Sequence, residues 1–222
     1  MEVVISGYGY NHPPEAVSNE ELTNAYNEYV DIYNIRKKSE IADGKVSRLQ
    51  KSSPEFIKQA SGIQSRYVRD KKNLLNPNIL FPKLKQRDDN EISLQAEVSI
   101  DAARKSLATG QKHPQDIDCV IISSSHKQRD FPSVSIEVQN ELGATGFAFD
   151  MGVACSSATY GIQAAYAMIV SGSATSVLLI SPEIKSGQFD MRDRSSNFIF
   201  GEATSALLLE RSDISKAKKN LR

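Results

Sequence analysis

Residues 147–172 read FAFDMGVACSSATYGIQAAYAMIVSG, a hydrophobic run that meets small residues around Cys155. From Ser156 to Val170 the apolar residues recur at helical spacing, at Ala158, Ile162, Ala165, Tyr166 and Ile169. Ser156 and Ser157 are good N-cap residues, and Gly172 fits the end of the helix. The stretch therefore predicts that Cys155 lies where a buried strand turns into a helix.

Cys155 is the first candidate for chemistry. Its small neighbours suit a nucleophile elbow, in which a tight turn presents one side chain at the end of a strand. Free N–H groups at the start of the following helix favour a thiolate over a thiol. The alternative is a buried cysteine that packs as a small hydrophobe, and the residues alone leave both interpretations open.

The composition indicates an ordinary globular protein. The chain has 222 residues, 40% of them hydrophobic, which suffices for a sizeable core. Lys and Arg number 27, as do Asp and Glu, so we expect no general attraction to nucleic acid or membrane. The two cysteines, Cys119 and Cys155, form no disulfide framework or metal-ligand spacing, which favours a reducing, cytoplasmic setting. We expect neither a signal peptide nor a membrane span.

Strands and helices alternate along the predicted chain. We expect strands at 3–5, 63–68, 118–123, 176–181 and 204–210 and just before Cys155, and helices at 18–33, 53–61, 93–107, 131–142 and 156–170. Gly7-Tyr8-Gly9 reads as a tight strand exit, and residues 70–90 as a surface excursion. The alternation predicts an α/β fold with a mostly parallel sheet. Sites in such sheets gather at the carboxyl ends of strands, where Cys155 and residues 124–130 fall.

Histidine is the usual base beside a cysteine nucleophile. His126 follows a predicted core strand at its carboxyl end and is the best candidate of the three histidines. His12 and His113 lie in predicted loops, and we expect both to face solvent. Cys119 lies within the strand at 118–123 and is expected to be part of the core.

The sequence also resembles a known family. DMGVACSSATYGIQAA (150–165) and DMRDRSSNFIFGEATSALLLER (190–211) resemble the region around the active-site cysteine of β-ketoacyl-acyl carrier protein synthase III, a thiolase-fold condensing enzyme. VVISGYGYNHPPEAVSNEEL, SGIQSRYV and FPSVSIEVQNELG match the same family in the same order, so the resemblance covers nearly the whole chain. The long segment from Asn27 to Ser53, together with CSSATYGIQAA, is most similar to the subgroup that forms β-ketodecanoyl-type products.

The resemblance implies an α/β, thiolase-like fold, of which this chain is the amino-terminal half. Residues 1–215 would form the half-domain, with a helical and loop insertion at 34–92, and 216–222 a polar tail or linker. Cys155 would take an acyl group from acyl-CoA as a thioester, and decarboxylative condensation with malonyl-acyl carrier protein would follow. Both thioesters are substrates, so no cofactor is implied. The expected partners are acyl-CoA, acyl carrier protein, and a second copy or a second thiolase-like half.

The same resemblance assigns binding residues. Phe131 aligns with the aromatic that lines the partner's acyl tunnel, and Ile199 and Phe200 align with tunnel-wall positions. Arg194 aligns with an arginine that contacts the CoA adenine region. Phe56 replaces the family's tryptophan that stacks on adenine, and Ala60 replaces an arginine close behind it. The lost cation should weaken CoA binding or change its mode.

One departure from the family concerns the second step. A His and an Asn from the second half polarise the malonyl thioester in this family, and this chain has neither. We therefore expect self-acylation at most, from a synthase III-like acyltransferase that is incomplete by itself. The alternatives are a non-catalytic interaction or chain-length subunit of a split thiolase-fold enzyme, and thiolase or polyketide-type acyl transfer. The retained Cys155 weighs against a purely structural subunit.

Overall fold

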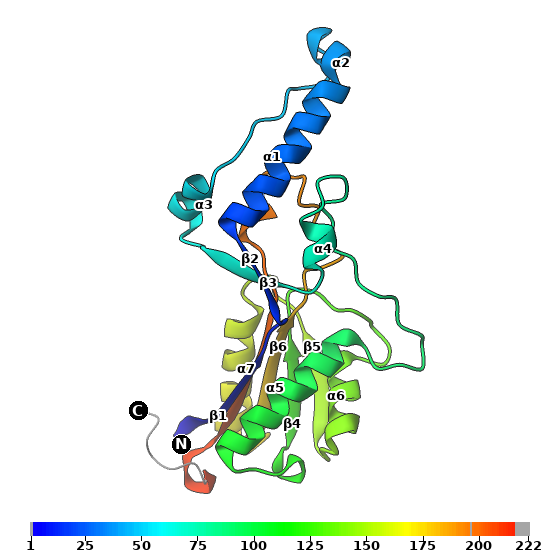
Figure 1. The fold of residues 1–222 in the computed structure, drawn as a ribbon. Coiled ribbons are helices and arrows are strands. Elements are labelled where there is room, and N and C mark those ends of the chain that lie inside the picture. Colours follow the sequence, from blue (N-terminus) through cyan, green and yellow to red (C-terminus); the bar gives the residue numbers. More distant parts are fainter. Residues whose placement is uncertain (1, 196, 216–222) are drawn as a thin grey trace. The chain divides into compact units, whose positions relative to one another are not determined.

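The computed structural model describes residues 2–195 and 197–215, which form two compact units (Figure 1). One unit comprises the described parts of residues 1–12, 87–184 and 203–222. The other comprises the described parts of 13–86 and 185–202. The predicted tail at 216–222 lies outside the described residues. Each unit is taken by itself below.

The first unit is built on a five-stranded sheet of order β1-β7-β6-β4-β5. Its strands are β1 (Val3–Asn11), β4 (Cys119–Ser123), β5 (Phe147–Met151), β6 (Ser176–Glu183) and β7 (Ala203–Arg211). The α/β prediction is confirmed, but the sheet is mixed, because β7 pairs antiparallel with both β6 and β1. No crossover helix of this unit joins β6 to β7 in the described chain, so β7 runs back from the end of β6.

Helices cover both faces of this sheet. Helices α5 (Leu94–Gly110) and α6 (Val134–Leu142) lie on one face, and α7 (Ser157–Ser171) lies on the other (Figure 1). On β6, Leu178 and Ile180 join the core cluster that includes α5 and α6, while Val177 and Leu179 join the cluster with α7. This period of two explains the continuous apolar run, since both faces are covered. Two short 3-10 turns complete the unit, at Pro114–Asp116 and Ser212–Ile214.

The helix after Cys155 packs on a face that matches the predicted one only in part, since Ala165 and Ile169 are buried as expected. Its buried residues follow one another at intervals of four, at Ser157, Gly161, Ala165 and Ile169. All of them except Ile169 are small. Three positions expected to face the core are exposed: Ala158, Ile162 and Tyr166. A Cβ added at Gly161 would lie 2.6 Å from Leu179 Cδ1, so the helix approaches the sheet closely. The close approach requires the small face, and the larger apolar side chains stay outside.

Glycine serves a similar purpose in β1. The predicted strand exit at Gly7-Tyr8-Gly9 is wrong, because the strand continues to Asn11. A Cβ at Gly7 would lie 2.2 Å from the Ser106 carbonyl oxygen, and one at Gly9 would lie 2.1 Å from that of Ala102. These glycines therefore let the strand lie directly against α5.

Helix α5 also extends beyond its predicted end at Leu107. It continues through Gly110. The left-handed residue that ends the helix is Gln111, with φ 54°. At Gly110 itself a Cβ would lie 2.6 Å from Leu208 Cδ2, so this glycine serves packing on β7.

The second unit holds a small antiparallel sheet and four helices. Its elements are β2 (Glu15–Ser18), α1 (Asn19–Arg36), α2 (Lys38–Ala42), α3 (Pro54–Ser61), β3 (Ser65–Val68), α4 (Lys71–Leu74) and a 3-10 turn at Asn197–Ile199. A capping box starts α1 where the helix was predicted to begin: the Ser18 hydroxyl accepts the Glu21 N–H at 3.1 Å, and the Glu21 carboxylate accepts the Ser18 N–H at 2.9 Å. Residues 70–90 are more than a surface excursion, because Leu74 and Leu80 are fully buried.

Candidate active site

Cys155 is presented by a tight turn between β5 and α7. Ala154 has φ 47°, a left-handed conformation that costs a residue with a Cβ about 1–2 kcal/mol. The Ser156 N–H donates to the Val153 carbonyl at 3.0 Å, and the Ser157 N–H to the Ala154 carbonyl at 3.1 Å. Cys155 is exposed, which contradicts the alternative of a cysteine buried in the core. The predicted turn from strand to helix is confirmed, but the strand is not buried, because β5 lies at the edge of the sheet.

The other cysteine has the opposite environment. Cys119 is fully buried in β4, as predicted, and belongs to the cluster beneath α7. Burial, with a smaller contribution from the charge of Asp118, raises the pKa of the Cys119 thiol to about 12. Near neutral pH this thiol is therefore protonated and inert.

Polar groups fix the loop that follows β4. The Glu183 carboxylate at the end of β6 accepts the Ser125 N–H at 2.7 Å and the Ser125 hydroxyl at 2.6 Å. The Gln95 side-chain amide donates to the His126 carbonyl at 3.0 Å. These bonds hold the His126 backbone at the carboxyl ends of the strands, and the role of its imidazole as a catalytic partner stays a prediction. His12 and His113 are exposed, as expected.

Phe131 projects from the loop between β4 and α6. Its side chain is 93% exposed, and the helix predicted to begin there begins instead at Val134. The reason is a cap that the sequence did not indicate: the Asp150 carboxylate accepts the Val134 N–H at 3.1 Å and the Ser135 N–H at 2.8 Å. Asp150 lies on β5, so the strand that leads to Cys155 also anchors the helix after Phe131.

In the second unit, Phe56 and Arg194 meet although they lie far apart in sequence. The Arg194 guanidinium carbon lies 4.8 Å from the centre of the Phe56 ring, a cation–π arrangement. Phe56 remains 46% exposed on α3, so part of its ring is open to a further partner. The two residues that the resemblance assigns to CoA binding are thus in contact with each other.

The other two predicted residues of this unit differ in environment. Ile199 is 54% exposed, whereas Phe200 is half-buried. The Phe200 ring stacks on Phe189, with 4.0 Å between ring centres and 15° between planes. Sequence reasoning missed Phe189, which directly precedes the segment at 190–211 that carries the family resemblance.

Two buried charges anchor the segment 185–202 that carries these residues. The Arg66 guanidinium donates to the Phe198 carbonyl at 2.8 Å, and desolvation lowers the Arg66 pKa. At the other end, the Glu202 carboxylate accepts the Ser186 N–H at 2.5 Å. The segment is therefore held at both ends by groups with low exposure, Arg66 at 5% and Glu202 at 4%.

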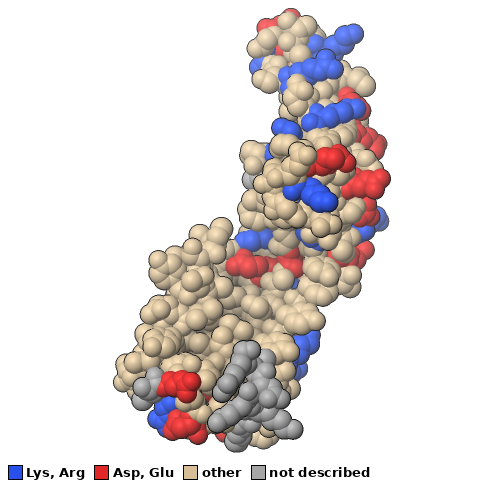
Figure 2. Space-filling view, turned by 90° about the vertical axis from the view of Figure 1, so that its left-hand side faces the viewer, with Lys and Arg blue, Asp and Glu red and all other residues tan. Residues whose placement is uncertain are grey.

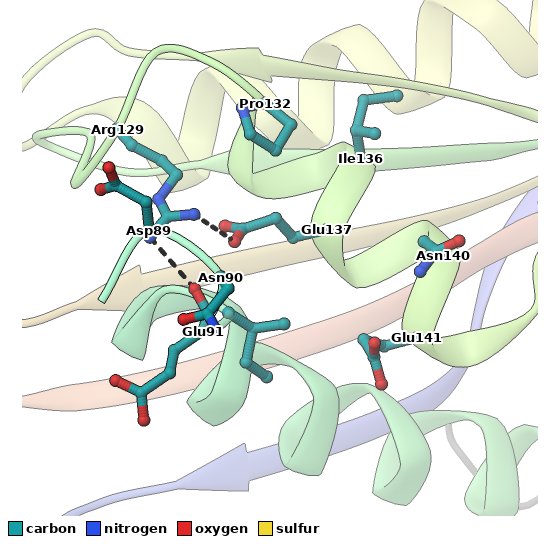
Figure 3. Close-up of a pocket in the computed structure, with 10 residues that line it drawn as sticks. Asp89, Asn90, Glu91, Arg129, Pro132, Ile136, Glu137, Asn140 and Glu141 are labelled. Atoms are coloured by element: carbon teal, nitrogen blue, oxygen red, sulfur yellow. Dashed lines mark hydrogen bonds and ion pairs between the residues drawn. The ribbon is translucent and has the colours of Figure 1, made fainter. Parts of the chain in front are cut away.

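A pocket of about 300 Å³ lies in the first unit, beside α6 (Figure 3). Its carboxylates come from Asp89, Glu91, Glu137 and Glu141. The Arg129 guanidinium donates to the Glu137 carboxylate at 3.1 Å (Figure 3). None of the predicted site residues lines this pocket. Within the described ranges, no three His, Cys, Asp or Glu side chains gather as a metal site, and no helix is long and apolar enough to cross a membrane.

Comparison with known proteins identifies relatives of the chain. Residues 149–221 match the family model of 3-oxoacyl-[acyl-carrier-protein (ACP)] synthase III. A β-ketodecanoyl-[acyl-carrier-protein] synthase of Pseudomonas aeruginosa is 43% identical over 194 residues, which are 87% of this chain and 55% of that protein. A β-ketoacyl-[acyl-carrier-protein] synthase III of Jannaschia sp. is 36% identical over 163 residues, 73% of this chain and 44% of that protein. The chain spans about half the length of the curated relatives it matches.

Solved structures give the same fold. The 3-oxoacyl-[acyl-carrier-protein] synthase III of Aquifex aeolicus superposes with a TM-score of 0.69 at 25% identity, over 96% of this chain and 55% of that one. A priming β-ketosynthase of the R1128 polyketide pathway superposes with a TM-score of 0.68 at 23% identity, over 96% and 51%, which shows the fold alone. The sheet, its helices and the cysteine turn thus define a thiolase-like α/β protein. With the sequence relatives, they show that the chain belongs to the 3-oxoacyl-[acyl-carrier-protein] synthase III family.

Proposed function

We propose that Cys155 accepts an acyl group from acyl-CoA as the first step of a condensing reaction in fatty-acid synthesis. The observation that carries this proposal is the exposed Cys155 at the turn between β5 and α7, inside the segment that matches the family. In the step, the Cys155 sulfur attacks the thioester carbonyl carbon. The bond from that carbon to the CoA sulfur breaks, and CoA leaves as a thiolate that takes up a proton.

The second step is decarboxylative condensation. Malonyl-acyl carrier protein loses CO2, and the resulting carbanion attacks the acyl carbonyl on Cys155. The carbon–sulfur bond breaks, which frees the cysteine and leaves a β-ketoacyl product on the carrier protein. By the family resemblance, the His and Asn that assist this step come from a second thiolase-like half. The proposed chemistry uses no metal or resident cofactor, since both reactants are thioesters.

The Phe56–Arg194 pair supports the choice of acyl-CoA as the donor. Adenine is a flat aromatic ring, which suits the open part of the Phe56 ring, and the guanidinium beside it suits phosphate. Ala60 offers no second cation, so we expect weaker CoA binding than in relatives with arginine there. Ile199 and Phe200 are proposed to line the acyl tunnel, and Phe131 is proposed to line the tunnel of a partner chain.

Two surfaces of the first unit support pairing with another thiolase-like chain. Strand β5 lies at the edge of the sheet, and α7 contains no charged residue (Figure 2). On α7, Tyr160 is 55% exposed, Tyr166 46% and Val170 43%, and exposed apolar faces of this kind often mark an interaction site. We propose that a second copy pairs along β5 and that a second thiolase-like half covers α7, in a reducing cytoplasm. The exposed face of α7 also favours the second candidate function, a non-catalytic interaction or chain-length subunit.

Intact-protein mass spectrometry after incubation with a series of acyl-CoAs tests the proposal. We expect the chain to gain one acyl mass, which is absent in Cys155→Ala and reduced in Phe56→Ala. The acyl chain length that gives the most adduct then indicates the length of the acyl tunnel. A chain that forms a complex with a thiolase-like partner but shows no adduct, alone or in the complex, would favour the interaction subunit.

A further inference from the structure

The turn that presents Cys155 needs support. Ala154, the residue before the cysteine, has φ 47°, which an alanine adopts only when its surroundings impose it. The side chain of Cys155 itself is exposed, and Ser156, which caps α7, makes no side-chain hydrogen bond to the helix. The support must therefore come from elsewhere.

The Ser157 hydroxyl contacts the turn on both sides of the strained residue. Its oxygen accepts the Val153 N–H at 2.8 Å. Its single hydrogen has two carbonyl oxygens within reach, Ala154 at 2.7 Å and Ser124 at 3.0 Å. Both carbonyls can share this hydrogen, since a carbonyl oxygen has two lone pairs, and the contact with Ser124 joins the turn to the residue just beyond β4.

The backbone of the same serine makes a second connection to β4. The Ser123 hydroxyl donates to the Ser157 carbonyl at 2.6 Å. Ser123 is fully buried and Ser157 is 2% exposed, so these bonds lie away from water, where they hold geometry firmly. The close approach of α7 makes this possible, because a Cβ at Gly161 would already lie 3.0 Å from the Ser123 side chain.

We infer that Ser157 is a positioning residue for the reaction of Cys155: its buried hydroxyl clasps the turn to the end of β4 and keeps the thiol at the N-terminus of α7. The inference rests on the proposed role of Cys155 as the acyl acceptor. Without this hydroxyl, Ala154 relaxes from its left-handed conformation, and the thiol moves from the position that the turn gives it.

Two isosteric variants isolate the hydroxyl. Ser157→Thr keeps the oxygen, whereas Ser157→Val has the same shape without it. Ser157→Ala removes the oxygen without added bulk, and serves if valine disturbs folding. Ser156→Ala is the matched control, because the Ser156 side chain is exposed and makes no cap hydrogen bond.

Two rates are measured by intact mass on each variant of the chain. The first is alkylation of Cys155 by iodoacetamide. We expect Ser157→Val to react about two- to fivefold more slowly than Ser157→Thr, because the turn holds the thiol less firmly once a buried hydrogen bond is lost. The second is thioester formation from acyl-CoA. We expect its maximal rate to fall about tenfold in Ser157→Val, with the half-saturating concentration unchanged, as for loss of an interaction used only in the reaction. Ser157→Thr and Ser156→Ala should match the parent chain.

Equal alkylation rates in Ser157→Val and Ser157→Thr would overturn the inference, as would a slow Ser157→Thr. Labelling of the buried Cys119 in both Ser157→Val and Ser157→Ala would also overturn it, because the hydroxyl would then hold the unit rather than the turn. Alkylation needs no acyl-CoA. A parent chain that alkylates but forms no thioester would therefore refute the proposed function while the alkylation comparison still decides the role of Ser157.

Discussion

The two cysteines should differ in reactivity by orders of magnitude when the native chain is treated with iodoacetamide at pH 8. Cys119 has no exposed surface, and its pKa of about 12 lies far above that pH. Its thiol is then ionised in about one molecule in ten thousand, and only the thiolate reacts. Cys155 is exposed at the turn before α7. We therefore expect one alkyl group per chain, on Cys155, and labelling of Cys119 at least about a thousandfold slower.

The assay is a time course of intact mass followed by peptide mapping. Cys155→Ala is the control: it should stay unlabelled in buffer and gain one alkyl group once urea unfolds it, because unfolding exposes Cys119. Labelling of Cys119 in the native chain within tenfold of the rate at Cys155 would refute the reasoning. So would rapid labelling of native Cys155→Ala.

Three further predictions concern the packing around this site. Gly161→Ala should lower the free energy of unfolding by about 1–2 kcal/mol in urea titrations, because the clash with Leu179 outweighs the better helix propensity. The control, Thr159→Ala on the exposed face of α7, should not lower it. A Gly161→Ala variant more stable than the parent chain would contradict the described packing. Asp150→Ala should lower the free energy of unfolding by about 1 kcal/mol, because α6 loses its cap, and should speed hydrogen exchange in the first turn of α6. Unchanged exchange in that turn would rule out the capping role of Asp150. Burial of Cys119 should stabilise the fold below about pH 9, and this contribution should be lost as the pH rises toward about 12, because the thiol of the unfolded chain ionises near its ordinary pKa of 9.0. Cys119→Ala should remove this dependence of the free energy of unfolding on pH. An unchanged dependence in the variant would assign it to other groups.

Much of the secondary structure could be predicted because its causes are local. The runs that became β4 and β6 are apolar at consecutive positions, which suits strands covered on both faces. The start of α1 follows from the Ser18 capping box, and the start and end of α3 follow from Pro54 and Gly62. The place of Cys155 between strand and helix could be predicted for the same reason.

Features that depend on tertiary contacts could not be predicted in this way. Helix α7 is apolar nearly all round, so its periodicity does not tell which side packs on the sheet; the fit against Leu179 selects the side with Gly161. Gly7 and Gly9 read as a turn because the approach of α5 is not visible in sequence. The role of Ser157 likewise depends on where β4 ends.

The central claim is that Cys155 accepts the acyl group. It is tested most directly by the ratio of CoA released to acyl group bound at Cys155. The chain is incubated with one acyl-CoA, free CoA is quantified by chromatography, and the thioester on the Cys155 peptide is quantified by mass spectrometry before and after hydroxylamine. The account predicts one CoA released for each hydroxylamine-labile acyl group on Cys155, and neither product with Cys155→Ala. CoA release that persists in Cys155→Ala, or an acyl group found on another residue, would contradict it.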